Sequence, residues 1–122
     1  MASRKLSAIY DAALAPAGLT LAQYALMRAV KSNQPVSLTD LGRELELERS
    51  TVGRNVKVLE RLGALALTRG SEDQREAVVM LTESGTTMLE AALPLWQGCQ
   101  ATIRNQLGTG LDETIQALMN VV

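Results

Sequence analysis

The chain has no histidine and no phenylalanine, and its 122 residues include one cysteine, one tryptophan and two tyrosines. Without histidine, and with a single thiol, it lacks the residues that most often bind zinc or act as general bases. It also has no glycine-rich loop that could hold a phosphate group. These absences predict that the protein is not an enzyme and that it carries no metal and no cofactor.

Long apolar runs are absent as well. No segment approaches the roughly 20 apolar residues that a membrane-spanning helix needs, and the start of the chain lacks the apolar block of a signal peptide. The single cysteine cannot form an internal disulfide, which agrees with a reducing compartment. The sequence therefore predicts a cytoplasmic protein without membrane contact.

Aliphatic residues are plentiful: 47% of the chain is hydrophobic but only 2% is aromatic, so the core must be built from Leu, Val, Ala and Met. This composition favours helices, and the length predicts one domain. Apolar periodicity predicts helices over 4–15, 21–31, 38–46, 50–62, 83–107 (softly broken at Pro94) and 111–122. Short segments rich in β-forming residues predict strands over 65–69 and 77–81, joined by a charged turn over 70–76.

Polar residues precede three of these helices at capping positions. Thr20 and Gln23 have the spacing of a capping box, and Ser37 and Thr82 precede the helices that follow them. Glu48 precedes the helix over 50–62, where a serine or aspartate would cap better. The start of that helix is therefore expected to be weakly capped.

Residues 37–82 have the order of a helix-turn-helix unit followed by a wing. On the helix over 50–62, a seam of Val52, Val56 and Leu59 is predicted to face the core. The opposite face is polar and basic and carries no acidic residue. A solvated surface is the plain interpretation, but helix-turn-helix units use such a face to enter the major groove of DNA. The predicted DNA contacts are Ser50, Thr51, Arg54, Asn55, Lys57, Arg61, Arg69 and Arg75.

The lengths of these side chains and their positions along the helix predict different roles. Arg54 is long and central, so a bidentate contact to guanine is its strongest option. Lys57 and Arg61 lie further along the helix and suit phosphates. Asn55 is turned partly inward and could be either structural or base-reading.

The turn between the strands is the predicted wing. Arg75 could extend from its tip into the minor groove, whose negative potential attracts arginine. Asp73 would repel phosphate unless it pairs with Arg75 or Arg69 and orients the arginine. An unpaired surface carboxylate is the alternative.

The charge of the chain is unevenly distributed. The net charge is −1 and the pI about 5.4, which alone argue against a nucleic-acid partner. Residues 49–75, however, contain six basic and three acidic residues, whereas residues 76–122 contain five acidic and one basic. A local basic surface of this kind steers a protein onto phosphates.

Several motifs together resemble the MarR (multiple antibiotic resistance regulator) family of transcription factors. They are Gly18-Leu19-Thr20-x-x-Gln23, Arg49-Ser50-Thr51-Val52, Leu59-Glu60-x-Leu62-Gly63, Asp73-x-Arg75 and Leu81-Thr82-x-x-Gly85. The resemblance spans nearly the whole chain. It implies a mainly α fold with a small β-hairpin wing, in which 20–82 is a winged helix-turn-helix core and 1–16 and 83–122 are dimerisation helices.

The same resemblance implies a function. Such proteins bind pseudo-palindromic operators as homodimers, usually repress, and often release DNA when a small anion, a phenolic compound or an oxidant acts on them. Aromatic residues that could line an effector site are limited here to Tyr10, Tyr24 and Trp96. Cys99 falls on a core-like stripe, so a buried, inert thiol is favoured over an oxidant sensor.

Two alternatives remain open at this stage. The terminal helices could pack only on the winged unit of the same chain, although three extra apolar stripes on a small unit favour a dimer. The winged helix could also have lost DNA binding and act as a protein-binding antirepressor or scaffold.

Overall fold

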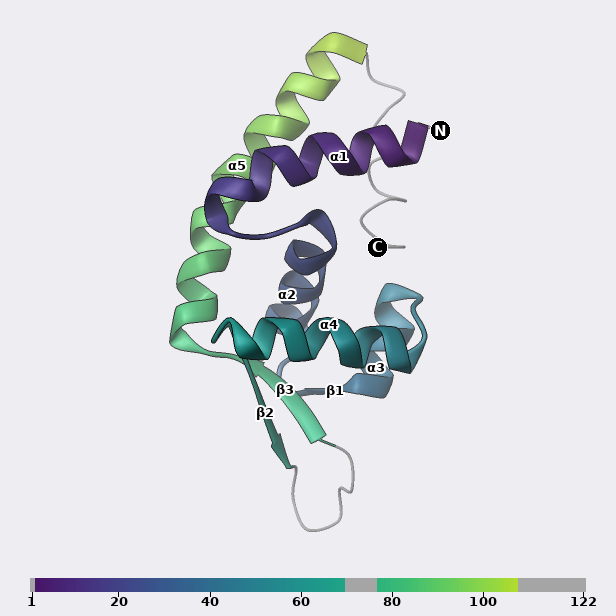
Figure 1. Ribbon diagram of the computed structural model, residues 1–122, viewed down its shortest axis with the longest axis vertical. Coiled ribbons are helices and arrows are strands. Elements are labelled where there is room, and N and C mark those ends of the chain that lie inside the picture. The colour runs from purple at the N-terminus through teal and green to yellow at the C-terminus, as the bar shows by residue number, and fades with distance from the viewer. Residues whose placement is uncertain (1, 70–76, 108–122) are drawn as a thin grey trace.

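A computed structural model describes residues 2–69 and 77–107 (Figure 1). Its elements are α1 (Ala2–Leu14), the 3-10 helix η1 (Ala15–Ala17), α2 (Leu21–Asn33), β1 (Val36–Ser37), α3 (Leu38–Leu45), α4 (Arg49–Arg61), β2 (Leu65–Arg69), β3 (Ala77–Leu81) and α5 (Glu83–Leu107). The predicted mainly helical fold with a β-hairpin is confirmed. The predicted helix over 111–122 and the wing turn, with Asp73 and Arg75, lie outside the described residues, as does the Arg69 side chain.

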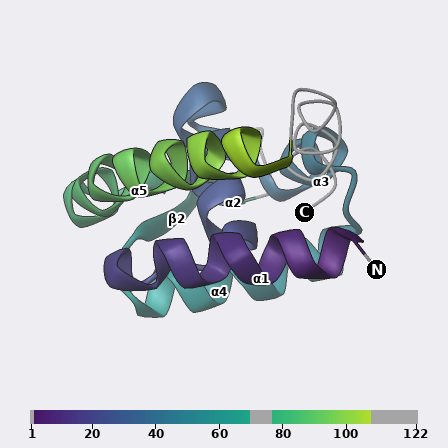
Figure 2. The same ribbon diagram turned by 90° about the horizontal axis from the view of Figure 1, so that it is seen from above.

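The helices form two connected groups. In Figure 1, α1 and the later part of α5 lie together at one end of the molecule, while α3, α4 and the sheet form the other end. Figure 2 looks along the long axis, so that α1 lies in front of α4. The helix α2 contacts both groups. Its side chains Tyr24, Leu26 and Met27 are almost fully buried, so α2 is the centre of the core. None of the described helices is long and apolar enough to cross a membrane.

The sheet has three antiparallel strands in the order β1-β3-β2. The strands β2 and β3 have the predicted bounds and pair from Leu65 opposite Leu81 to Arg69 opposite Ala77. The strand β1 was not predicted. Its two residues, Val36 and the capping Ser37, lie just before the predicted helix over 38–46, and they are too few to show an alternating pattern.

The capping predictions are confirmed. The Thr20 hydroxyl accepts from the Gln23 amide at 3.1 Å, and the Gln23 side chain accepts in return from the Thr20 amide at 2.9 Å. Ser37 and Thr82 each accept a bond from the amide three residues further along. Glu48 makes no side-chain capping bond, as expected for a weak cap.

The predicted interruption at Pro94 is wrong. The helix α5 continues through this proline over 25 residues. Proline removes one helical hydrogen bond, to the carbonyl of Glu90. Both Glu90 and Pro94 are exposed, so water can satisfy that carbonyl and the helix need only curve.

Candidate nucleic-acid interface

The angle between α3 and α4 is set by close backbone packing at Gly42. A Cβ atom added to this residue would lie 2.8 Å from the Leu47 carbonyl oxygen and 3.7 Å from a Val52 methyl group. Any larger residue would push the two helices apart. The buried seam of α4, Val52, Val56 and Leu59, then packs into the core with no exposed surface.

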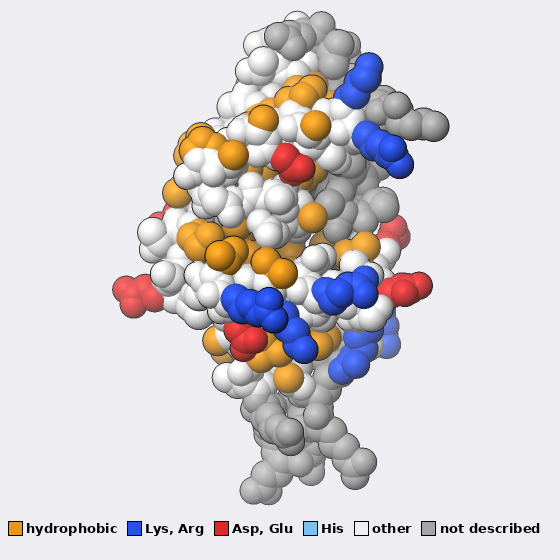
Figure 3. Space-filling view, viewed as in Figure 1, with side chains coloured by type: hydrophobic (Ala, Val, Ile, Leu, Met, Phe, Trp, Pro, Cys, Tyr) orange, Lys and Arg blue, Asp and Glu red, His pale blue; other side chains and the backbone are white. Residues whose placement is uncertain are grey.

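The opposite face of α4 carries the residues that the sequence placed there. Ser50, Arg54, Lys57 and Arg61 are all exposed, whereas Asn55 is half-buried on the flank. Figure 3 shows Lys and Arg side chains gathered on this face at the level of α4. The predicted orientation of the helix is therefore confirmed. Its contacts with DNA remain a prediction.

The first turn of α4 is well suited to an anion. It contains no acidic residue, and Glu48 leaves its amide groups without a side-chain cap. The positive end of the helix dipole therefore lies beside Ser50 and Thr51. One turn further on, the Arg54 guanidinium donates a long bond of 3.4 Å to the Thr51 hydroxyl, which bends the arginine toward this end of the helix.

A tight junction joins the end of α4 to the start of α5. The Thr82 hydroxyl donates to the carbonyl oxygens of Gly63 and Ala64, the latter at 3.1 Å. A Cβ atom at Gly85 would lie only 2.0 Å from the Ala64 carbonyl oxygen. The start of α5 is therefore in direct backbone contact with the segment that follows α4.

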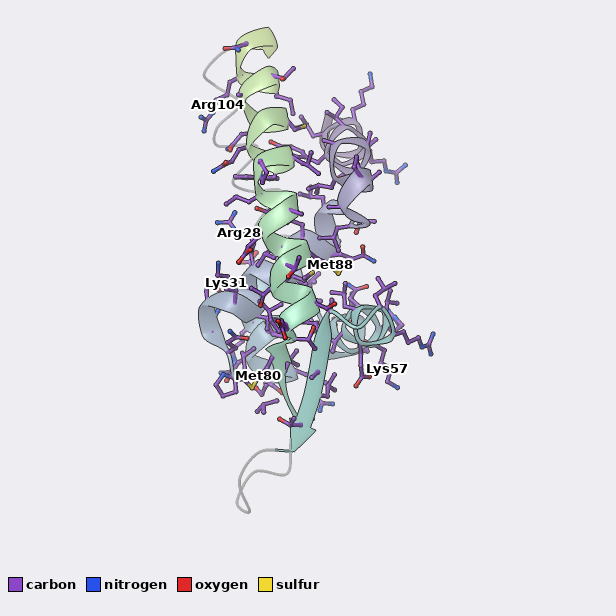
Figure 4. The ribbon with its side chains drawn as sticks, turned by 90° about the vertical axis from the view of Figure 1, so that its left-hand side faces the viewer. Arg28, Lys31, Lys57, Met80, Met88 and Arg104 are labelled. Atoms are coloured by element: carbon purple, nitrogen blue, oxygen red, sulfur yellow. The ribbon has the colours of Figure 1, made fainter. Side chains whose placement is uncertain are left out.

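A second polar feature lies between α2 and α5. It is a cleft of about 360 Å³, lined by Tyr24, Arg28, Lys31, Ser32, Leu89, Glu90 and Leu93. The Arg28 guanidinium carbon lies 5.3 Å from the centre of the Trp96 ring and 5.8 Å from that of Tyr24. Figure 4 places Arg28 and Lys31 on the opposite side of the molecule from Lys57 of α4. A molecule in this cleft would lie away from the basic face of α4.

The aromatic residues that the sequence singled out meet behind this cleft. The Trp96 ring lies 5.9 Å from Tyr24 and 6.4 Å from Tyr10. Both tyrosine hydroxyls and the Trp96 indole nitrogen are buried, with no hydrogen-bond partner among the residues that the structure describes. Burial raises the pKa of Tyr10 to about 12, and that of Tyr24 in the same direction. Sequence reasoning missed Arg28, although its i+4 spacing from Tyr24 placed both on one helix face.

Cys99 occupies a different place, an apolar groove between α1 and α5 that Ile9, Ala13 and Ile103 also line. It is half-buried and packs against the core, so the expected burial of the thiol is confirmed only in part. One side of the residue is left uncovered by the part of the chain that the structure describes. Burial of the other side raises the pKa of the thiol, which disfavours the reactive thiolate.

Comparison with known proteins gives consistent matches. The sequence profile of the MarR family matches residues 17–76. The transcriptional regulator MosR of M. tuberculosis, solved in complex with DNA, is 32% identical, with 97% of this chain and 87% of that chain covered and a TM-score of 0.83. The organic hydroperoxide resistance transcriptional regulator of Bacillus subtilis is 25% identical, over 98% of this chain and 81% of the relative.

A third match concerns the fold alone. A mutant of MarR from E. coli, solved with operator DNA, is 20% identical, with a TM-score of 0.81 over 95% of this chain and 84% of that chain. The family profile, the regulators from two other bacteria and the winged architecture all agree with the motifs found in the sequence. The chain belongs to the MarR family.

Proposed function

We propose that this protein is a sequence-specific DNA-binding transcriptional regulator, and that it represses from a pseudo-palindromic operator as a cytoplasmic homodimer. The observation that carries the proposal is the exposed, acid-free face of α4, with Ser50, Arg54, Lys57 and Arg61 opposite a fully buried seam. Two relatives support it: one is named as a transcriptional regulator, and another was solved bound to DNA.

In this proposal α4 enters the major groove. Arg54 reads a guanine edge, while Lys57 and Arg61 contact phosphates. Residues 20–82 form the DNA-binding core, and the wing contributes Arg69 and Arg75, with Asp73 orienting the arginine toward the minor groove. Asn55 is half-buried on the side of α4, so it can reach only a base edge that lies close to the sugar–phosphate wall of the groove.

The dimer is formed by residues 1–16 and 83–122. The helices α1 and α5 present an incompletely covered apolar groove in which Ile9 is 45% exposed. A second copy would cover it and would bring two α4 helices onto one face. Half-sites would then lie about 34–36 Å apart, one turn of the double helix.

The decisive experiment is selection of bound sequences from a random duplex pool, followed by titration at low and at moderate salt. We expect an inverted repeat with half-sites one helical turn apart, and binding that weakens steeply with salt. If no duplex is bound at low salt and a protein partner is captured instead, the chain is a protein-binding winged helix and the proposal is wrong.

The cleft between α2 and α5 is the proposed effector site. Arg28 and Lys31 provide positive charge against the carboxylate of Glu90, and Tyr24 provides aromatic surface, with the Trp96 ring behind Arg28. This combination fits a small aromatic anion, whose ring would contact the side chains and whose charge would pair with Arg28.

Trp96 is the only tryptophan, and its ring centre lies 5.3 Å from the Arg28 guanidinium carbon, so we expect its fluorescence to respond when a ligand pairs with Arg28. Titration with benzoate should change that fluorescence saturably and release bound DNA, and the Arg28→Met variant should show neither effect. The Lys57→Met variant serves as a control and should keep the fluorescence response. An unsaturable response with no release of DNA would remove the aromatic anion from the proposal.

A further inference from the structure

Gly53 is a glycine in the interior of α4 for which the described part of the molecule gives no reason. A Cβ atom added there would meet nothing within 4 Å, whereas one at Gly42 or Gly85 would collide with backbone. Gly53 is also not among the residues with positive φ. Since glycine is less favourable than alanine inside a helix, Gly53 lowers the stability of α4, and no contact among the described residues compensates for this loss.

The position of Gly53 on α4 suggests what the missing side chain makes room for. It lies three residues after Ser50 and four before Lys57, so the three residues share one side of the helix. Ser50 and Lys57 are exposed and Gly53 is half-buried. Ser50 and Lys57 belong to the outward face that also carries Arg54, and Gly53 lies beside them on its flank. No side chain in the described part of the chain fills the space at Gly53, next to a hydroxyl and an ammonium group.

The dimensions of DNA indicate which part of it would meet this space. A helix with its side chains is about 10–12 Å across, and the major groove is about 12 Å wide. The outward face of an inserted helix therefore meets base edges, while its flanks are held against the sugar–phosphate walls. A flank without a side chain lets one wall approach the helix backbone directly.

We propose that Gly53 is the point of closest approach between α4 and the DNA backbone, with a phosphodiester held between the Ser50 hydroxyl and the Lys57 ammonium group. The inference rests on the proposed function, because it assumes that α4 enters the major groove. It assigns a DNA-contact role to a residue without functional groups. Phosphate approach of this kind fixes the register of the helix and carries no sequence information.

The test compares Gly53→Ala with Gly98→Ala in the full-length protein. Gly98 is likewise a helical glycine with nothing within 4 Å of an added Cβ, but it lies in α5, away from α4. Both variants should melt at a higher temperature than the wild type because alanine favours the helix. The Gly53→Ala variant should bind both the selected operator and a random duplex about tenfold more weakly. Gly98→Ala is a control for the melting temperature alone, because Gly98 lines the α1–α5 groove.

Several results would overturn the inference while leaving the proposed function intact. One is wild-type affinity of Gly53→Ala for both duplexes, and another is a changed preferred sequence, which would place Gly53 over base edges. A lowered melting temperature would show an internal need for glycine, and a changed sedimentation coefficient would show a contact between subunits. Failure of the wild type to bind any duplex would instead contradict the proposed function itself.

Discussion

Arg54 and Lys57 lie three residues apart on the exposed side of α4, but their side chains suit different tasks. The guanidinium of Arg54 is a planar fork whose geometry matches the two acceptors of guanine, whereas the lysine ammonium is a compact point charge. The bond from Arg54 to the Thr51 hydroxyl uses one of five N–H donors and leaves the others for DNA. This division of tasks is a prediction from side-chain geometry.

The Arg54→Lys variant separates the two tasks. It keeps the charge but removes the fork, so discrimination for the preferred base at one operator position should fall by about 1–3 kcal/mol. Binding to random duplex should change little. Competition titration with single-base operator variants measures both quantities.

The matched control for this experiment is Lys57→Met. It should weaken binding to every duplex alike and reduce the slope of log affinity against log salt by about 1. If the two variants lose affinity equally on all duplexes, Arg54 is a phosphate contact and its assigned role is wrong.

Tyr10 gives the protein a pH dependence at the alkaline end. Burial raises its pKa from the usual 10.0 to about 12. Above pH 10 the unfolded chain loses this proton while the folded protein keeps it, so stability should be complete below pH 10 and fall as the pH rises toward 12. Two pKa units correspond to at most about 2.7 kcal/mol. Chemical unfolding between pH 9 and 12 measures how the free energy of unfolding changes with pH, and the Tyr10→Phe variant should show a smaller change. An unchanged pH dependence in that variant would show that other groups cause it.

At the scale of the elements, local sequence features predict some strands and helix caps and miss others. The bounds of β2 and β3 were predicted correctly because charged and glycine-containing segments flank them, and the caps at Thr20 and Thr82 follow from side-chain chemistry alone. The strand β1 was not predictable, because two residues carry no periodicity and the strand exists only through pairing with β3. The contact of Arg28 with Trp96 was missed for a related reason: it joins two helices far apart in the chain.

The junction between α4 and α5 depends on Gly85. In the Gly85→Ala variant the added Cβ would lie 2.0 Å from the Ala64 carbonyl oxygen, so the helix start must shift. Overpacking of this kind costs about 1–3 kcal/mol, measured as a lower midpoint of urea unfolding. The Gly98→Ala variant, which has open space, should instead be stabilised. Equal behaviour of the two variants would show that the junction is not tight.

At the scale of the molecule, Lys57 of α4 and the α2–α5 cleft lie on opposite sides, so an effector in the proposed cleft would have to change DNA binding through the fold. Two contacts offer routes. The Gln34 side chain at the end of α2 accepts from the Leu81 amide at 2.9 Å, and Thr82 ties the start of α5 to the end of α4. A ligand that changed the separation of α2 and α5 would therefore alter both the root of the wing and the position of the reading helix.

Dimer formation also concerns the whole molecule, because one winged unit alone contacts only half of a palindromic site. The groove between α1 and α5 exposes 45% of Ile9, and a charge placed there would have to be buried without a partner when a second copy packs on it. We expect Ile9→Glu to be monomeric in sedimentation velocity at concentrations where the wild type is a dimer. Each monomer should contact half the phosphates, so the dependence of binding on salt should also fall to about half.

The Ile9→Met variant keeps an apolar side chain of similar volume and should remain dimeric with the wild-type salt dependence. Circular dichroism of both variants tests whether the monomer is still folded. A folded Ile9→Glu variant that stays dimeric and binds the operator normally would show that the subunits join through another surface.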